Sequence, residues 1–187
     1  VAASPSGQYL VIQWNGDGDA RLSGVELYNV NTGAYVGHVA NHRQHSDMGY
    51  DENGNETYVT TYFGNSLLLT TTRFPGSVNF SASYDKVILD TGWDDVGHLS
   101  CKGPNGTIVV AAESGAGQPF AGEIYLVSTA GTAADGGQNS QAQVRRLAHH
   151  RSTSCEYYHQ PQPTMSRDGR YVVFASDWGT CANGADD

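Results

Sequence analysis

Basic residues are scarce in this chain of 187 residues, where 10 lysines and arginines stand against 19 aspartates and glutamates. The formal net charge of −9 disfavours nucleic acid as a partner, because nucleic-acid-binding proteins present a basic face. An acidic polysaccharide is still compatible with this charge, since a local cluster of arginine and histidine can oppose the overall field.

Long apolar runs are also missing, and none approaches the ~20 residues that a membrane-spanning helix requires. We therefore expect no membrane span. No signal peptide is evident, and the first residues already have the pattern of a strand and a turn, so we expect the natural N-terminus to lie elsewhere.

Four catalytic or cofactor motifs are absent. The sequence has no Gly-x-Ser-x-Gly nucleophile elbow, so we expect no serine hydrolase of that kind in this segment. It also has no phosphate loop, no dinucleotide-binding fingerprint and no Cys-x-x-Cys pair, so we expect no organic cofactor.

The sequence is rich in glycine, with 23 residues, and in short β-branched and aromatic runs, which together favour an all-β fold. A polar turn that ends in glycine and precedes an apolar strand occurs four times, at residues 4–12, 51–59, 103–111 and 166–174. Spacings of roughly 50 residues are typical of the four-stranded blades of a β-propeller.

The repeat predicts one propeller segment of about three and a half blades, with the last blade incomplete. The expected blades are residues 1–44, 45–97, 98–153 and 154–187. Because such a segment leaves apolar blade faces open, we expect a larger propeller of about seven or eight blades, completed by further blades or by self-association. Residues 129–142 have loop composition and are interpreted as an expanded turn.

Three histidines stand just before the innermost strands of successive blades: His45, His98 and His159. Equivalent positions in a propeller converge on the central channel, so these imidazoles are candidates for one metal-binding or proton-transfer site. The alternative is that each histidine is a structural hydrogen-bonding residue of its own blade.

A second candidate is the polar stretch 147–162, which is dense in histidine, tyrosine and amide side chains. Arg151 is the candidate for pairing with a substrate carboxylate, and His150 and Tyr157 are the candidates for proton transfer. The alternative is a polar loop between blades.

A third candidate is an acidic loop that carries oxygen side chains at every second position, in Asn15, Asp17 and Asp19. This spacing suits calcium, although the loop lacks the distal glutamate of an EF-hand. A solvated turn is the alternative.

The chain has three cysteines, and Cys155 and Cys181 lie equally far from Asp168, the centre of a predicted hairpin turn. Residues equidistant from such a turn face each other, so we predict a disulfide between them and a buried thiol at Cys101. The alternative is that all three are reduced and buried. The disulfide would indicate an oxidising compartment, and we expect a secreted, periplasmic or cell-surface protein.

The strand pattern of residues 166–174 resembles the repeat of the Tol-type translocation propeller. The longer stretch 147–179, with weaker support from 45–51 and 97–100, is similar to secreted bacterial propellers related to oligogalacturonate lyase. This resemblance implies β-elimination of uronic-acid oligosaccharides with a manganese-like divalent metal, held by histidines and a glutamine at the channel mouth.

Carried onto this sequence, the family's paired histidines fall on Gln160 and Gln162, while His98 matches the upstream histidine. Glutamine is a poorer ligand than imidazole for transition metals, so manganese, calcium and zinc all remain candidates. Two functions follow: a lyase acting on acidic polysaccharide, or a non-catalytic module that binds glycan or protein.

Overall fold

The computed structural model describes residues 1–63, 67–75, 84–92, 96–113, 119–134, 138–153, 155 and 157–180. These residues form antiparallel β-strands and a short 3-10 helix, η1 (Tyr157–His159), which confirms the all-β prediction. Within the described ranges, no helix is long and apolar enough to cross a membrane.

Most of the strands belong to three four-stranded sheets. The first sheet contains β1 (Ala2–Ala3), β2 (Tyr9–Gln13), β3 (Val25–Asn29) and β4 (Tyr35–Ala40). The second contains β5 (Ser46–Tyr50), β6 (Glu56–Phe63), β7 (Leu67–Arg73) and β8 (Lys86–Gly92). The third contains β9 (Val96–Ser100), β10 (Thr107–Ala112), β11 (Glu123–Ser128) and β14 (Val144–His149).

A fourth, two-stranded sheet follows, made of β15 (Thr164–Met165) and β16 (Val172–Val173). In each unit the first two strands pair with each other across one of the turns that repeat along the sequence. Strand β9 begins at Val96, two residues before the boundary at 98 that the sequence repeat suggests.

The four repeated turns share one backbone conformation. Their glycines, Gly7, Gly54, Gly106 and Gly169, have φ angles of 74°, 81°, 76° and 71°. A positive φ is open to glycine at little cost and strained for side chains with a Cβ, which explains why glycine ends each turn. The turn-then-strand repeat predicted from the sequence is therefore confirmed at all four places.

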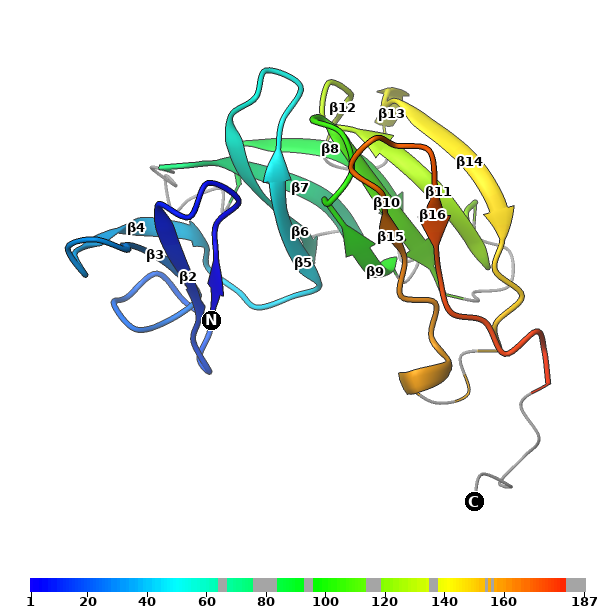
Figure 1. The fold of residues 1–187 in the computed structure, drawn as a ribbon, viewed down its shortest axis with the longest axis horizontal. Coiled ribbons are helices and arrows are strands. Elements are labelled where there is room, and N and C mark those ends of the chain that lie inside the picture. Colours follow the sequence, from blue (N-terminus) through cyan, green and yellow to red (C-terminus); the bar gives the residue numbers. More distant parts are fainter. Residues whose placement is uncertain are drawn as a thin grey trace.

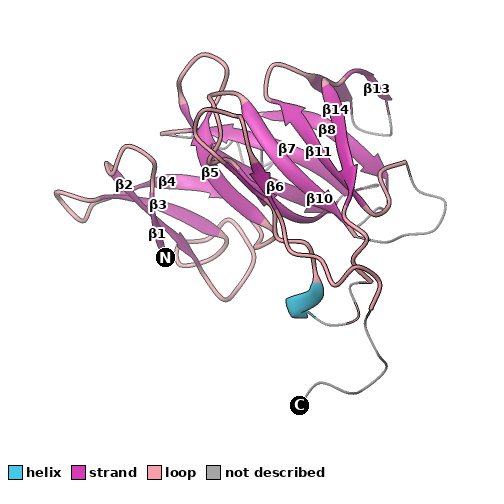
Figure 2. Cartoon of the chain, turned by 45° about the vertical axis from the view of Figure 1, so that its right-hand side comes forward, coloured by secondary structure: helices cyan, strands magenta, loops and turns pink. Residues whose placement is uncertain are grey.

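The sheets stack face to face in chain order, as Figures 1 and 2 show. Between the first and second sheets lie Val25, Leu27, Met48 and Tyr58, among others. The larger core between the second and third sheets includes Leu69, Ile88, Ile108 and Val110. The third sheet packs on the fourth through Val109, Ala111, Ile124 and Met165.

Strand β10 shows why an apolar run without alternation folds as a strand here. Ile108 and Val110 point into the core shared with the second sheet, whereas Val109 and Ala111 point toward the fourth. A strand covered on both faces needs apolar side chains at consecutive positions.

Residues 129–142 differ from the expected open turn, because part of this stretch forms a second hairpin of β12 (Thr132–Ala134) and β13 (Gln138–Gln141). The hairpin packs on β8: Ala133 lies in a small core with Leu68 and Val87. The Asn139 side chain accepts from the amide of Asp90 at 2.8 Å and donates to the carbonyl of the same residue. Polar composition hid this hairpin, because the Asn139 hydrogen bonds supplement only a small apolar contact through Ala133.

Residues of the first strands, or of the turns that follow them, line one cavity of about 490 Å³ in all four units. Its lining includes Ala3 from β1, Met48 from β5, Lys102 just after β9 and Met165 from β15. One space therefore receives the first strand or the following turn of every unit.

Candidate functional site

Two of the three predicted histidines meet where the second and third sheets begin. His45 immediately precedes β5, and His98 lies within β9, the corresponding first strand of the next sheet. Their ring centroids are 4.8 Å apart, with the ring planes nearly perpendicular at 85°. The carbonyl of His45 accepts the amide of Thr61 at 3.1 Å, which anchors its backbone to β6.

The segment around η1 adds two further side chains to this pair. The amide oxygen of Gln160 lies 2.9 Å from Nε2 of His98, within hydrogen-bond distance. The ring of Tyr157 contacts His98 edge-to-face, with centroids 5.7 Å apart. The Gln160 amide also donates to the Tyr157 carbonyl at 3.3 Å, so the turn itself sets both side chains toward His98.

The first sheet contributes a polar connection next to His45. The side-chain amide of Gln13, at the end of β2, donates to the Ser46 hydroxyl at 2.8 Å and to the Tyr58 hydroxyl at 3.0 Å. Burial raises the pKa of Tyr58, so its hydroxyl stays protonated and fixes this network. Sequence reasoning missed Gln13, whose only signal was its position at the end of the repeat's strand.

The site offers two kinds of chemistry. Imidazole nitrogens and an amide oxygen are ligand types that divalent metals accept in proteins, and His45, His98 and Gln160 present them from three successive units. His45, His98 and Gln160 are therefore the candidate ligands for a divalent metal. In addition, a histidine beside an exposed tyrosine can exchange protons with a bound molecule.

The structure does not bring His159 to this site. Its Nδ1 lies 2.9 Å from Sγ of Cys155, and it also neighbours Asp177, with ligand atoms of all three residues within 4.8 Å of one another. Successive residues of a tight turn point in different directions, so when Gln160 faces His98 its neighbour faces away. These three side chains form a second group, separate from the histidine pair, that could hold a metal ion.

His150 is a structural residue. It is buried, its Nε2 donates to the Ala112 carbonyl at 2.8 Å, and its Nδ1 accepts the Ser152 amide at 2.9 Å. Burial lowers its pKa, which keeps the ring neutral. With both nitrogens occupied by backbone, the proton-transfer role expected for His150 is not supported.

The neighbouring candidates Arg151 and Gln162 are exposed. Arg151 has a positive φ of 57°. Among the described residues, no hydrogen bond or ion pair links Arg151 or Gln162 to the histidine pair. The polar stretch 147–162 is thus divided: Tyr157 and Gln160 reach the site, and the others do not.

In the acidic loop, Asn15 and Asp17 bind an arginine, Arg43. Nη1 of Arg43 donates to the Asn15 side chain at 2.9 Å, and the Arg43 amide donates to Asp17 at 3.0 Å. Asp19 is exposed, and its side chain makes no contact with this arginine in the described part of the chain. A guanidinium from the β4–β5 connection therefore takes the place expected for calcium, and the sequence spacing could not reveal it.

No family model, curated protein or solved structure matches this chain. The geometry of the histidine pair therefore stands beside the motif resemblance as the basis for a function.

The structure describes two of the three cysteines, Cys101 and Cys155. Cys101 is free and buried, as predicted, and burial raises the pKa of its thiol well above the usual value. Cys181 lies outside the described residues, so its pairing with Cys155 stays a prediction.

Proposed function

We propose that this chain is part of a β-propeller that binds an acidic polysaccharide beside His45, His98 and Gln160, and cleaves it by metal-assisted β-elimination. The observation that carries the proposal is the meeting of these three side chains from three successive units of the repeat. Residues so far apart in sequence meet only through the repeat, as expected for a site on a propeller axis.

The propeller architecture is itself supported by two features. The sheets stack face to face in chain order, with a core between each neighbouring pair. All four units then line one cavity with their first strands or the turns that follow them, as blades around a channel would. The proposed blades are residues 1–44, 45–97, 98–153 and 154–187 of a larger ring of about seven or eight.

In β-elimination, a base removes the proton next to the uronate carboxylate, a carbon–carbon double bond forms, and the glycosidic oxygen leaves with a proton. A divalent ion held by His45, His98 and Gln160 would neutralise the uronate carboxylate and acidify that proton. Tyr157, exposed and in contact with His98, is placed to exchange protons with the sugar. Arg151 is exposed and remains the candidate for a second carboxylate.

A second function is favoured by the aromatic side chains of η1. Tyr157 and Tyr158 contact each other edge-to-face, and the Tyr158 side chain is 82% exposed. Exposed rings of this kind can pack against the apolar faces of sugars, and this requires no proton transfer. A non-catalytic glycan-binding propeller would therefore use the same surface.

The proposal includes a secreted, periplasmic or cell-surface location. It is supported by the predicted Cys155–Cys181 disulfide, because disulfides persist in oxidising compartments.

The test incubates the purified protein with polygalacturonate and with alginate in the presence of Mn²⁺ or Ca²⁺. The ultraviolet absorbance of unsaturated uronate products is recorded, and binding is measured in parallel by calorimetry. The wild type should generate product, His98→Ala should lose at least about a hundredfold in rate, and His159→Ala should retain activity. Binding without product would support the glycan-binding module, and the absence of both would contradict the two functions.

A further inference from the structure

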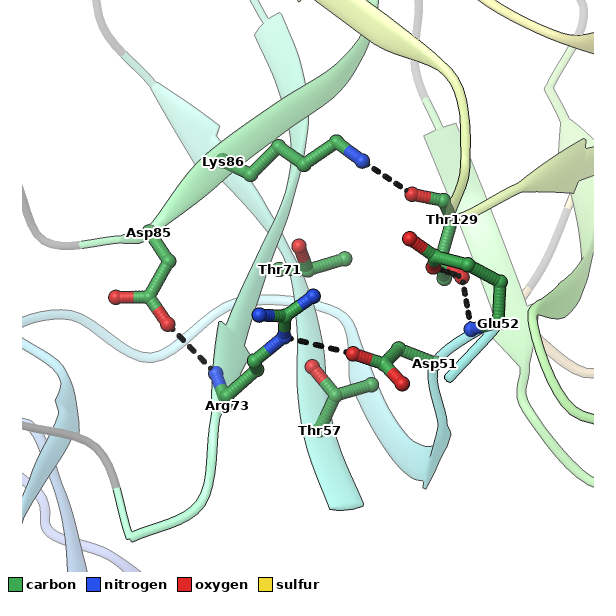
Figure 3. A pocket seen from close by; sticks show the side chains of 8 residues that line it. All are labelled: Asp51, Glu52, Thr57, Thr71, Arg73, Asp85, Lys86 and Thr129. Carbon is green, nitrogen blue, oxygen red and sulfur yellow. Dashed lines mark hydrogen bonds and ion pairs between the residues drawn. The ribbon is translucent and has the colours of Figure 1, made fainter. Parts of the chain in front are cut away.

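A second cavity, of about 240 Å³, lies between the second and third sheets and is lined by charged and hydroxyl side chains (Figure 3). Arg73 from the end of β7 and Lys86 from the start of β8 supply the positive charges. Asp51, Glu52 and Asp85 supply the negative charges, and Thr57, Thr71 and Thr129 supply hydroxyls. None of these residues belongs to the histidine site.

The cavity is remote from His45. Strand β5 runs from Ser46, next to His45, to Tyr50, next to Asp51. Six extended residues span about 20 Å, so the two sites lie at opposite ends of the same strand. A ligand in this cavity is therefore independent of the function proposed above.

Asp51 holds Arg73 in a fixed orientation. The buried carboxylate accepts the amides of Asn53 and Asn55 at 2.9 Å each, and it accepts Nε of Arg73 at 2.7 Å. Burial alone would raise the pKa of Asp51, but these hydrogen bonds hold it below its usual value. The Arg73 guanidinium is thus paired with Asp51 through Nε, and its two Nη groups remain to donate to a ligand.

The carboxylates of the cavity are committed, whereas the cations keep donors to spare. Glu52 accepts the Thr129 hydroxyl at 2.6 Å, and Asp85 accepts the Arg73 amide at 2.8 Å. Lys86 donates to the Thr129 carbonyl. Within the described part of the chain, neither Nη group of Arg73 has a partner, and Lys86 has one partner for its three donors. The buried Thr71 hydroxyl, drawn between the two cations in Figure 3, likewise bonds to no described residue.

We propose that this cavity binds a small monocarboxylate, with its two oxygens on the Nη fork of Arg73 and with Lys86 and Thr71 donating to it. Guanidinium groups bind planar carboxylates through two parallel hydrogen bonds, and the fork is free for such a pair. Three acidic residues against two basic ones make a doubly charged phosphate or sulfate less favourable than a single negative charge. The volume lies below the ~300–1,000 Å³ of sites for drug-sized ligands, so the ligand is small.

The experiment titrates the purified protein with sodium acetate, with D-glucuronate and with inorganic phosphate in a carboxylate-free buffer, followed by NMR chemical shifts and calorimetry. We expect saturable binding of the carboxylates and weaker binding of phosphate. Arg73→Gln should weaken carboxylate binding by about tenfold or more, since the paired, charge-assisted hydrogen bonds are lost.

Arg170→Gln is the matched control, because it removes the same charge from an exposed arginine paired with Asp168 in another turn. Thr71→Val is a second variant that keeps Asp51 paired, and it should weaken binding by a few-fold. The proposal is overturned if phosphate binds as tightly as acetate, if Thr71→Val and Arg73→Gln bind like the wild type, or if no carboxylate saturates the shifts. A uronate oligomer that binds more tightly than the monomer would identify a glycan, rather than a free acid, as the source of the carboxylate.

Discussion

Among single residues, Glu26 shows how the fold stabilises a buried charge. Its side chain in β3 is fully buried, and it accepts hydrogen bonds from Trp14, from Nε of Arg21 at 2.9 Å and from the Tyr28 hydroxyl at 2.7 Å. Burial alone would raise the pKa of Glu26. These hydrogen bonds and the one from the Leu22 amide outweigh burial and hold the pKa below its usual value. The loop before β3 is therefore organised around one carboxylate.

We predict that Glu26→Ala lowers the free energy of unfolding by about 3–5 kcal/mol, because it leaves Arg21, Trp14 and Tyr28 without their buried partner. Glu26→Gln should cost less, since an amide oxygen can still accept. Denaturant unfolding measures both. Asp19→Ala, at an exposed position, is the control and should stay within about 0.5 kcal/mol of the wild type. Equal losses for Asp19→Ala and Glu26→Ala would contradict this role.

His150 makes stability depend on pH. Burial holds its pKa in the folded protein below the ordinary value of 6.5, so the unfolded chain takes up a proton first as the pH falls. The stability that the neutral His150 ring contributes to the folded protein is fully present above pH 6.5. It is lost as the pH falls toward the pKa of the folded state. His42, whose pKa burial also lowers, adds to the same trend.

We therefore predict that His150→Gln reduces the decline in the free energy of unfolding between about pH 7 and pH 5, relative to the wild type. The remaining decline should come from His42, and a variant that also carries His42→Gln should be flatter still. Chemical denaturation at several pH values measures this. If the wild type and His150→Gln gave parallel profiles, the buried neutral histidine would be excluded as the cause.

Among the elements, β5 and the residue that follows β9 approach each other closely. A Cβ on Gly49 would lie 2.7 Å from the Cβ and 2.7 Å from the carbonyl oxygen of Cys101, closer than real contacts allow. Gly49 therefore permits the packing that places His45 beside His98. The sequence gives no sign of this, because Gly49 lies inside a strand, away from the repeated turns.

We predict that Gly49→Ala destabilises the fold by about 1–3 kcal/mol through overpacking between the two sheets. Gly16→Ala is the matched control, because a Cβ there has no heavy atom within 4 Å. Thermal unfolding of both variants checks the difference. Equal melting temperatures for the two would mean that the sheets can separate at Gly49 without cost.

The strands that follow repeated turns were predictable from sequence, since a glycine at positive φ followed by an apolar run is a local signal. The meeting of His45 with His98 also followed, because both stand near the start of the first strand of a unit. The exclusion of His159 did not, because a tight turn decides which of two neighbouring side chains faces the site. The Arg43 contact with Asn15 was equally hidden, since it depends on two loops meeting in space.

For the whole molecule, the stacked sheets explain why the histidine site and the Arg73 cavity are separate. The histidine site and the Arg73 cavity lie at opposite ends of the first and second strands of the same units, and sheet-to-sheet packing fixes their separation. One scaffold thereby carries two chemically different surfaces, one with imidazoles and tyrosines and the other with a guanidinium and an ammonium group.

The most direct test of the central claim is a calorimetric titration of metal-free protein with Mn²⁺. We predict one ion bound per chain in the wild type, loss of binding in His98→Ala, and retention in His159→Ala, because His98 and Gln160 face the site while His159 faces Cys155 and Asp177. Retained binding in His98→Ala, or its loss in His159→Ala, would contradict the account.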